Sequence, residues 1–161
     1  MSDAETNLPL WLAFLSLNEQ ATRDWLTGLR NRRYFEETLA DHVAAANRYD
    51  RELSLALFDI DQFKQINDQN GHEAGDSALK HFAELLTSTA RAADIVCRYG
   101  GDEFAVILPE TNKASAEHFA ERVAAKQMFP TITAGIAALP CENLVAEADA
   151  HLIFRKKESR R

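Results

Sequence analysis

Apolar residues recur at helical spacing in several stretches of the chain, with short and nearly continuous apolar runs between them. The helical spacing and the turn signals around it predict helices over residues 34–47, 62–68, 76–89, 114–126 and 144–157. Runs of β-prone residues predict strands over 53–60, 95–97, 104–108 and 131–138. The run 53–60 is apolar except at Ser54 and Asp59, which is typical of a central strand covered on both faces. Helices and strands mixed in this way predict one α+β domain.

Polar residues at the boundaries of these elements predict where the helices begin. Asn31 follows a turn and is expected to cap the first helix. Asp61 directly follows the strand 53–60 and is expected to cap the next helix. Residues 70–76 are expected to form a loop, whose Asp76 caps the helix that follows.

Two adjacent glycines, Gly100 and Gly101, stand between two predicted strands and predict a two-residue hairpin. Asp102 and Glu103 follow its tip directly, and Asp59 stands near the end of the buried strand. Carboxylates are depleted in strands and are costly to bury without partners. Side by side on a rigid hairpin they suit a divalent metal ion. The alternative interpretation is a solvated hairpin end with two exposed acids.

Composition narrows the choice of protein class. Of the 161 residues 46% are hydrophobic and 27% are charged, the balance of an ordinary globular domain. The net charge of -7 argues against a general nucleic-acid surface, so no nucleic-acid partner is expected. Cys97 and Cys141 are too few for a disulfide framework or a zinc site, which makes the reducing cytoplasm the simplest location. The five histidines lack metal-ligand spacing and are interpreted as structural or solvated.

The N-terminal residues 1–23 are too few for a domain of their own. Trp11, Phe14 and Leu15 give them a short amphipathic character, which predicts a helical extension that packs on the body or on a second copy. The apolar run 8–17 is shorter than the roughly 20 residues of a spanning helix and follows acidic rather than basic residues. No membrane segment or signal peptide is therefore expected.

Five blocks of sequence follow one another in a fixed order. They are Asp24-x-Leu26-Thr27-Gly28-Leu29-x-Asn31-Arg32, Asp59-x-Asp61-x-Phe63-Lys64-x-Ile66-Asn67-Asp68, Gly71-His72-x-x-Gly75-Asp76, Gly100-Gly101-Asp102-Glu103-Phe104 and Ala148-Asp149. In these blocks the chain resembles the GGDEF domain of diguanylate cyclases, from residue 24 to residue 161. The resemblance implies a palm-like, mostly antiparallel sheet surrounded by helices, as in nucleotidyl cyclases. It also implies a homodimer in which two GTP molecules condense to cyclic di-GMP with loss of two pyrophosphates.

The resemblance also implies roles for the acids. Asp59, Asp102 and Glu103, with the carbonyl of Ile60, match the ligands of a magnesium or manganese ion. Asp102 or Glu103 is expected to help activate the attacking 3′-hydroxyl group, and the resemblance leaves open which of the two takes the proton.

Nucleotide contacts are implied along the same blocks. Backbone N–H groups at Gln62 and Phe63 are expected to meet phosphate, with added charge from Lys64. Asn67 and Asp76 match the guanine-binding positions, and a carboxylate that accepts from N1–H and N2–H of guanine favours GTP over ATP. The substrate-binding set is completed by the glycines of the hairpin and by two basic residues near the C-terminus: Gly100, Gly101, Lys156 and Arg160.

Arg91 and Asp94 match an Arg-x-x-Asp site at which the family binds its product as feedback control. The C-terminal segment departs from the family pattern, for example at Ile153, where a tyrosine is usual. A catalytically weak domain that senses cyclic di-GMP or GTP is the alternative function. Intact Asp59, Asp102 and Glu103 argue against it, and an acidic chain of this size offers no template groove for a polymerase.

Overall fold

The computed structural model describes residue 19 and residues 21–159. These residues form the helices α2 (Arg32–Tyr49), α3 (Phe63–Asn70), α4 (His72–Thr89), α5 (Lys113–Lys126) and α6 (Leu144–Glu158), and the strands β1 (Leu53–Ile60), β2 (Ile95–Arg98), β3 (Glu103–Pro109) and β4 (Ile132–Ala138). Most of the predicted extension over 1–23 lies outside the described residues, as does Arg160. Among the described residues, none of the helices combines the length and the hydrophobicity of a membrane span.

The four strands form one antiparallel sheet in the order β2-β3-β1-β4. β1 lies in the interior of the sheet, between β3 and β4, and all eight of its residues are buried. The predicted central strand over 53–60 is therefore confirmed, and so is the α+β palm-like class.

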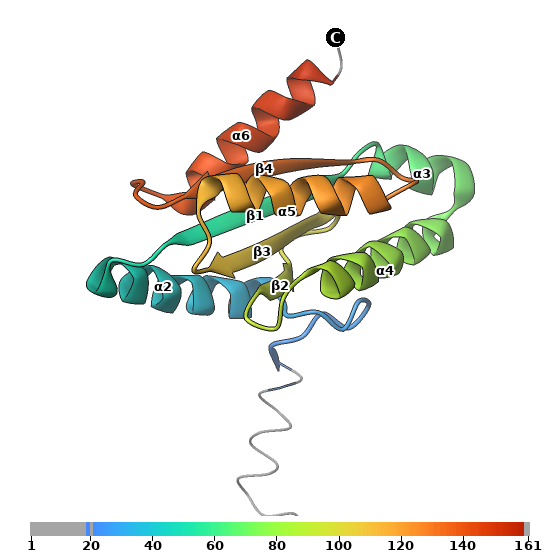
Figure 1. The fold of residues 1–161 in the computed structure, drawn as a ribbon. Coiled ribbons are helices and arrows are strands. Elements are labelled where there is room, and N and C mark those ends of the chain that lie inside the picture. The colour runs from blue at the N-terminus through green and yellow to red at the C-terminus, as the bar shows by residue number, and fades with distance from the viewer. Residues whose placement is uncertain (1–18, 20, 160–161) are drawn as a thin grey trace, which may run out of the picture.

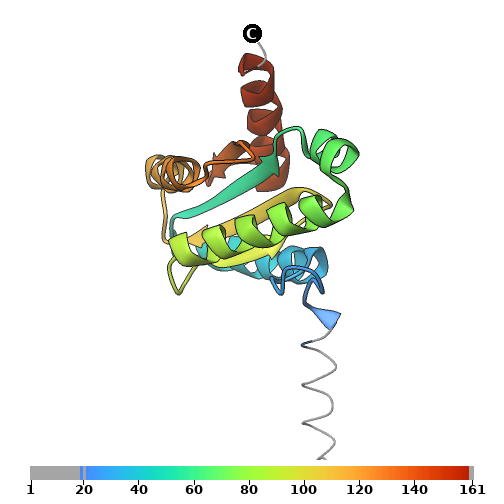
Figure 2. The same cartoon turned by 90° about the vertical axis from the view of Figure 1, so that its right-hand side faces the viewer.

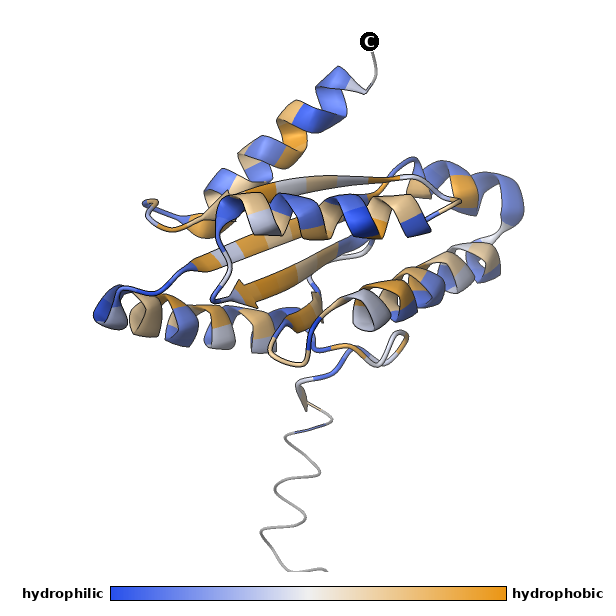
Figure 3. Ribbon diagram, viewed as in Figure 1, coloured by the Kyte–Doolittle hydropathy of each residue, from blue (hydrophilic) through white to orange (hydrophobic). Residues whose placement is uncertain are grey.

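Alternation along the strands assigns each side chain to one of two cores, because successive strand residues point to opposite faces. Ala56, Phe58 and Ile60 of β1 pack with buried residues of α3, α4 and α5. Leu55 and Leu57 pack on the opposite face, with buried residues of α2 and α6. In Figure 3 the strands are coloured mostly as hydrophobic and the surrounding helices carry both hydrophobic and hydrophilic colours, as expected for a sheet enclosed by amphipathic helices. Asp59 follows this alternation and is directed to the face covered by α2 and α6.

The predicted helix cap at Asn31 is confirmed, and the predicted caps at Asp61 and Asp76 are wrong. Asn31 caps α2 by accepting a hydrogen bond from the N–H of Tyr34. Asp61 does not cap α3, because its carboxylate accepts instead from Thr133 Oγ1 at 2.7 Å. The predicted loop over 70–76 is also wrong: only Gly71 separates α3 from α4, and Asp76 lies inside α4. Gly71 makes this sharp link with a φ of 84°, a conformation that favours glycine.

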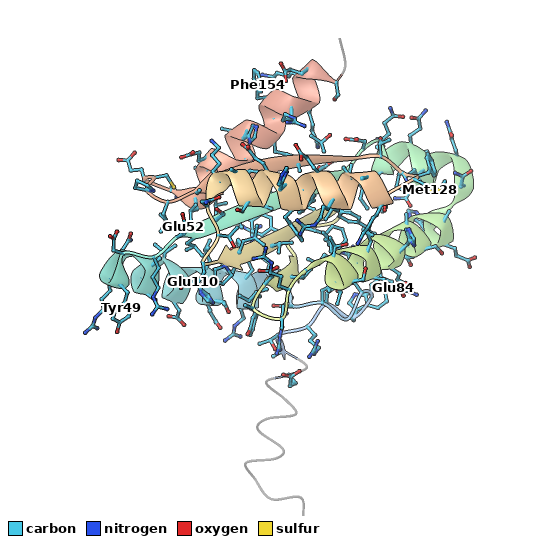
Figure 4. All side chains as sticks on the ribbon, in the orientation of Figure 1. Tyr49, Glu52, Glu84, Glu110, Met128 and Phe154 are labelled. Carbon is cyan, nitrogen blue, oxygen red and sulfur yellow. The ribbon has the colours of Figure 1, made fainter. Side chains whose placement is uncertain are left out.

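Helix α6 packs closely against β4. A Cβ atom on Gly135 would overlap the carbonyl oxygen of Ala148 and approach Leu152, so glycine is required for this contact. The N–H of Ile136 donates to Nδ1 of His151 at 3.0 Å, which covers part of the open edge of the sheet. Beyond these contacts α6 extends past the sheet (Figures 1 and 2), and Phe154 on it points away from the body (Figure 4).

Candidate active site

Asp59 and Glu103 face each other across neighbouring strands. They are direct partners in the antiparallel register of β1 and β3, so their side chains leave the same face of the sheet a few ångströms apart. Asp59 is only 7% exposed. The hydrogen-bonded sheet fixes the spacing of these two carboxylates before any ligand binds.

The hairpin between β2 and β3 is longer than the sequence predicted. Residues 99–102 separate the two strands, and neither glycine has a positive φ, so the two-residue turn is wrong. Instead, the N–H groups of Tyr99 and Gly100 both donate to the carbonyl of Glu103, at 2.8 and 3.1 Å. A Cβ atom on Gly100 would come within 2.6 Å of a carboxylate oxygen of Glu103, which shows that this side chain folds over the glycine.

Asp102 lies in the hairpin loop rather than on the strand. Its carbonyl accepts a hydrogen bond of 3.2 Å from the N–H of Ile60, which joins the loop to the end of β1. Asp102 is therefore not subject to the alternation that separates neighbouring side chains on a strand. For this reason Asp102 and Glu103 can both interact with Asp59 although they are adjacent in sequence. The charge of Asp102 raises the pKa of Asp59, and the charge of Asp59 raises the pKa of Glu103.

Arg98 holds the hairpin from the other side, a role that the sequence did not predict. Its Nη2 and Nε atoms donate to the carbonyl of Gly101 at 2.7 and 3.2 Å. Its Nη1 atom contacts both carboxylate oxygens of Asp24. Both residues stand in or beside quoted motif blocks, but only the fold shows that they meet.

Burial and mutual repulsion raise the pKa values of two acids at this site. Burial raises the pKa of Asp59 above its usual range; Lys156 opposes this shift, and Asp102 and Asp61 add to it. Burial also raises the pKa of Glu103, and the charges of Asp59 and Asp102 add to the shift. A cation that binds to such a cluster stabilises the charged form of its buried carboxylates.

Lys156 supplies a positive charge to this cluster from α6. Its Nζ atom lies 2.6 Å from Oδ2 of Asp59, and its side chain is 29% exposed. Asp149, one α6 residue of the quoted Ala-Asp pair, lines a cavity of about 370 Å³ together with Glu103 and Tyr99. Asp149 had no predicted role, and its position beside Glu103 follows from the packing of α6.

The donor set fits a hard divalent cation that is shared with a ligand. The carboxylates of Asp59, Asp102 and Glu103 and the carbonyl of Ile60 are oxygen donors of the kind that magnesium and manganese prefer. Among the described side chains, however, no group of three or more His, Cys, Asp and Glu residues is arranged to hold an ion alone. Magnesium is commonly held by one or two carboxylates plus substrate phosphates. The site therefore fits an ion that completes its coordination with a nucleotide.

The start of α3 presents free backbone donors near the end of β1. Gln62 precedes this helix with a φ of 56°, an uncommon left-handed conformation for a residue with a side chain, and provides no side-chain cap. The first N–H groups of a helix have no partner within the helix, so those of Phe63 and Lys64 are suited to bind an anion. Lys64 is exposed and adds positive charge there.

The predicted guanine-binding residues come from two helices that approach each other closely. A Cβ atom on Gly75 would overlap the side-chain oxygen of Asn67 and come within 3.2 Å of the ring of Phe63. Gly75 therefore permits the contact between α3 and α4, and Asp76 is the next residue along α4. The fold brings Asn67 and the neighbourhood of Asp76 together, which the sequence suggested only through the motif.

Arg91 and Asp94 lie together at a turn, away from the acids. The carboxylate of Asp94 accepts from the backbone N–H of Arg91 at 2.7 Å. Both residues line a shallow depression that also includes Arg122 of α5. Arg122 was not predicted, because nothing in its local sequence relates it to residues that precede it by about thirty positions.

A palm-like antiparallel sheet with acids converging from two neighbouring strands defines the class of metal-assisted nucleotidyl-transfer domains. The chain belongs to the GGDEF diguanylate cyclase family: the family described as "Diguanylate cyclase, GGDEF domain" matches residues 21–161.

Curated relatives share the same domain. The chain is 40% identical over 145 residues to the diguanylate cyclase DgcS of Shewanella oneidensis, covering 90% of this chain and 42% of that protein. It is 36% identical over 162 residues to the diguanylate cyclase TpbB of Pseudomonas aeruginosa, covering 90% and 37%. It is 50% identical over 105 residues to the response regulator PleD of Caulobacter vibrioides, covering 65% and 23%. The chain thus spans less than half the length of these relatives.

Solved structures agree with the fold. The GGDEF domain of DgcB from Caulobacter crescentus, in complex with c-di-GMP, superposes with a TM-score of 0.82 at 30% identity, covering 86% of this chain and 89% of that one. The diguanylate cyclase SiaD of Pseudomonas aeruginosa, in complex with its activator SiaC, gives a TM-score of 0.82 at 32% identity, covering 92% and 63%.

Proposed function

We propose that this chain is an active, GTP-specific diguanylate cyclase that works as a homodimer. The observation that supports this most is the direct pairing of Asp59 with Glu103 at the end of the sheet, with Asp102 beside them. A weak, sensing domain would not need this costly set of partly buried acids. The domain would work in the cytoplasm, where GTP and magnesium are available and free cysteines stay reduced.

The geometry suggests separate roles for the residues around one nucleotide. Magnesium, when bound, neutralises charge on the attacking and leaving oxygens. Asp59, Asp102, Glu103 and the carbonyl of Ile60 would hold the ion. The residue that takes the proton from the 3′-hydroxyl is either Asp102 or Glu103.

The remaining contacts would position the substrate. Asn67 and Asp76 would bind the guanine edge, and the carboxylate of Asp76 would favour guanine over adenine. Backbone groups of Gln62 and Phe63 and the hairpin glycines would approach the phosphates, with Lys64 and Lys156 adding charge; Arg160 has the same expected role. Since the chemistry needs little covalent help from the protein, rate acceleration would come from positioning and charge.

Two copies of the chain would be required for each product molecule. Each chain offers one candidate nucleotide site, and the product needs each 3′-hydroxyl to attack the α-phosphate of the other nucleotide. A homodimer that apposes two such sites meets this requirement with one protein.

Product would also bind at Arg91 and Asp94 and inhibit the enzyme. The presence of Arg122 in the same depression supports this assignment, because two guanidinium groups suit the phosphates and guanine edges of a cyclic dinucleotide. An Arg91→Ala variant with unchanged product inhibition would show that this site is wrong.

The cyclase proposal is tested by incubating the purified protein with GTP and magnesium and quantifying cyclic di-GMP. The wild-type chain should form the product, and Asp102→Asn should reduce its formation by about a hundredfold to a thousandfold, the scale of losing a central electrostatic group. Asp68→Asn, a change at an exposed acid of α3, is the matched control. A folded dimer that binds GTP or cyclic di-GMP and yields no product would favour the sensor function instead.

A further inference from the structure

The ion pair between Lys156 and Asp59 involves an oxygen that a metal ion would also use. Nζ of Lys156 lies 2.6 Å from Oδ2 of Asp59, within hydrogen-bonding distance. An ammonium group and a divalent ion at this distance cannot both occupy the same side of one carboxylate oxygen. Binding of an ion to Asp59 from this side therefore requires Lys156 to move.

Lys156 lies on a fixed element, and its side chain is long enough for the head group to change partner. Helix α6 is fixed by the close approach at Gly135 and by the hydrogen bond between His151 and Ile136. The lysine follows His151 by five residues, about 1.4 helical turns, in the last part of α6. A four-carbon side chain that is 29% exposed can turn its ammonium group toward solvent without any movement of the helix.

The negative charge of the surrounding carboxylates stabilises the ammonium group of Lys156 beside Asp59. Asp59 is influenced by the carboxylates of Asp102 and Asp61, and Glu103 by Asp59 and Asp149. Among the described residues, Lys156 is the only cation recorded in contact with Asp59. A cation must balance this cluster, whether it comes from the protein or from solution.

We propose that Lys156 is an exchangeable internal cation, which binds Asp59 in the free protein and moves to the nucleotide phosphates when a metal–nucleotide complex enters. The phosphate partner rests on the proposed function. A free ion would displace the ammonium group and leave it without a counter-charge, whereas an ion carried by a triphosphate supplies one. Lys156 thereby couples the binding of ion and nucleotide and favours their complex over the free ion.

The coupling makes two predictions of opposite sign for Lys156→Met, which removes the charge and keeps most of the side-chain volume. Without nucleotide, manganese used as the probe should bind about tenfold more tightly, the change that about 1.4 kcal/mol of lost competition would produce. With saturating manganese, 3′-deoxy-GTP, which lacks the attacking hydroxyl, should bind more weakly by a similar factor. A merely structural role of Lys156 would weaken both.

The ion affinity is measured from the electron paramagnetic resonance signal of free manganese, and the nucleotide affinity by calorimetry. Lys157→Met removes the same charge from the next residue of the helix, which is exposed, and should change either affinity by less than about twofold. Asp59→Asn should abolish the tighter ion binding when combined with Lys156→Met.

The outcomes separate this inference from the proposed function. Unchanged or weaker manganese binding by Lys156→Met would overturn the exchange, even if the wild-type chain makes cyclic di-GMP. Tighter manganese binding with unchanged nucleotide affinity would also overturn it, because the ammonium group would then have no phosphate partner. A wild-type chain that binds no nucleotide would refute the proposed function, and the manganese measurement alone would still decide whether Lys156 competes with the ion.

Discussion

Arg98 and Asp24 are joined across 74 residues of chain by a two-point contact, in which Nη1 of the arginine lies 3.0 and 3.1 Å from the two carboxylate oxygens. Their side chains are only 15% and 16% exposed. Because Arg98 also binds the carbonyl of Gly101, the turn at the start of the domain and the hairpin that carries Asp102 form one hydrogen-bonded unit.

We therefore expect Asp24→Asn to weaken both the fold and the site. The loss of charge on one side of a largely buried pair should lower the free energy of unfolding by about 2 kcal/mol and reduce cyclase activity through a looser hairpin. Denaturant unfolding and product formation measure the two effects. Arg33→Met, which breaks the exposed pair with Glu37, should cost less than about 1 kcal/mol.

The Asp24 effect should also depend on pH. Burial raises the pKa of Asp24, but hydrogen bonds from Thr27 and Arg98 outweigh it and hold the pKa below its usual value. A lowered pKa stabilises the fold above the pKa of the unfolded carboxyl and loses this effect as pH falls through the folded value. The gap between wild type and Asp24→Asn should therefore narrow below about pH 4. A constant gap would show that charge is not its cause.

Gly75→Ala should impair nucleotide binding more than stability alone explains. The added methyl group would overlap the side chain of Asn67, so either that side chain or the whole of α3 must move away from Asp76. We expect KM for GTP to rise by about tenfold, a loss of about 1.4 kcal/mol, with kcat less affected. Ser77→Ala, at an exposed position of the same helix, is the control and should leave KM unchanged. An equal loss in both variants would contradict the assigned guanine site.

Glu103→Gln should stabilise the metal-free domain and abolish its activity. The raised pKa means that the folded protein holds this proton more tightly than the unfolded chain does. Wild-type stability therefore falls as pH rises from the usual carboxyl range through the folded value, and glutamine removes this cost. The gain in melting temperature, recorded with a chelator, should be present at pH 7 and shrink toward pH 4. Glu84→Gln, at an exposed acid of α4 (Figure 4), should show no such gain.

The two cysteines should react at very different rates with a thiol reagent. Burial raises the pKa of the Cys97 thiol to about 12, and the side chain is 0% exposed. Cys141 is partly exposed, although burial and Glu147 raise the pKa of its thiol too. At pH 8 the native protein should release one equivalent of chromophore, and the denatured chain two. A Cys141→Ser variant that still reacts quickly would refute the burial of Cys97.

The sequence by itself determined the elements that depend on local pattern and the residues proposed to carry the chemistry. The strand over 53–60 was predicted with its observed bounds, because a strand buried on both faces needs apolar residues at nearly every position. The cap at Asn31 followed from the preference of a short polar side chain for the first turn of a helix. Asp59, Asp102 and Glu103 were singled out because they stand in the motif blocks and because acids at the ends of buried strands are otherwise costly.

Only the tertiary structure decided how these residues meet. The hairpin was predicted too short because a Gly-Gly pair does not reveal that Glu103 accepts two backbone hydrogen bonds and closes a wider loop. Asp61 and Asp76 were predicted as caps because nothing local shows that Thr133 binds Asp61 or that Gly71 alone turns the chain. The contacts of Arg98 with Asp24 and of Lys156 with Asp59 depend on strand register and helix packing, and these are set by side chains distant in the sequence. For this reason the sequence identified the acids of the site, and the fold identified the cation that contacts them.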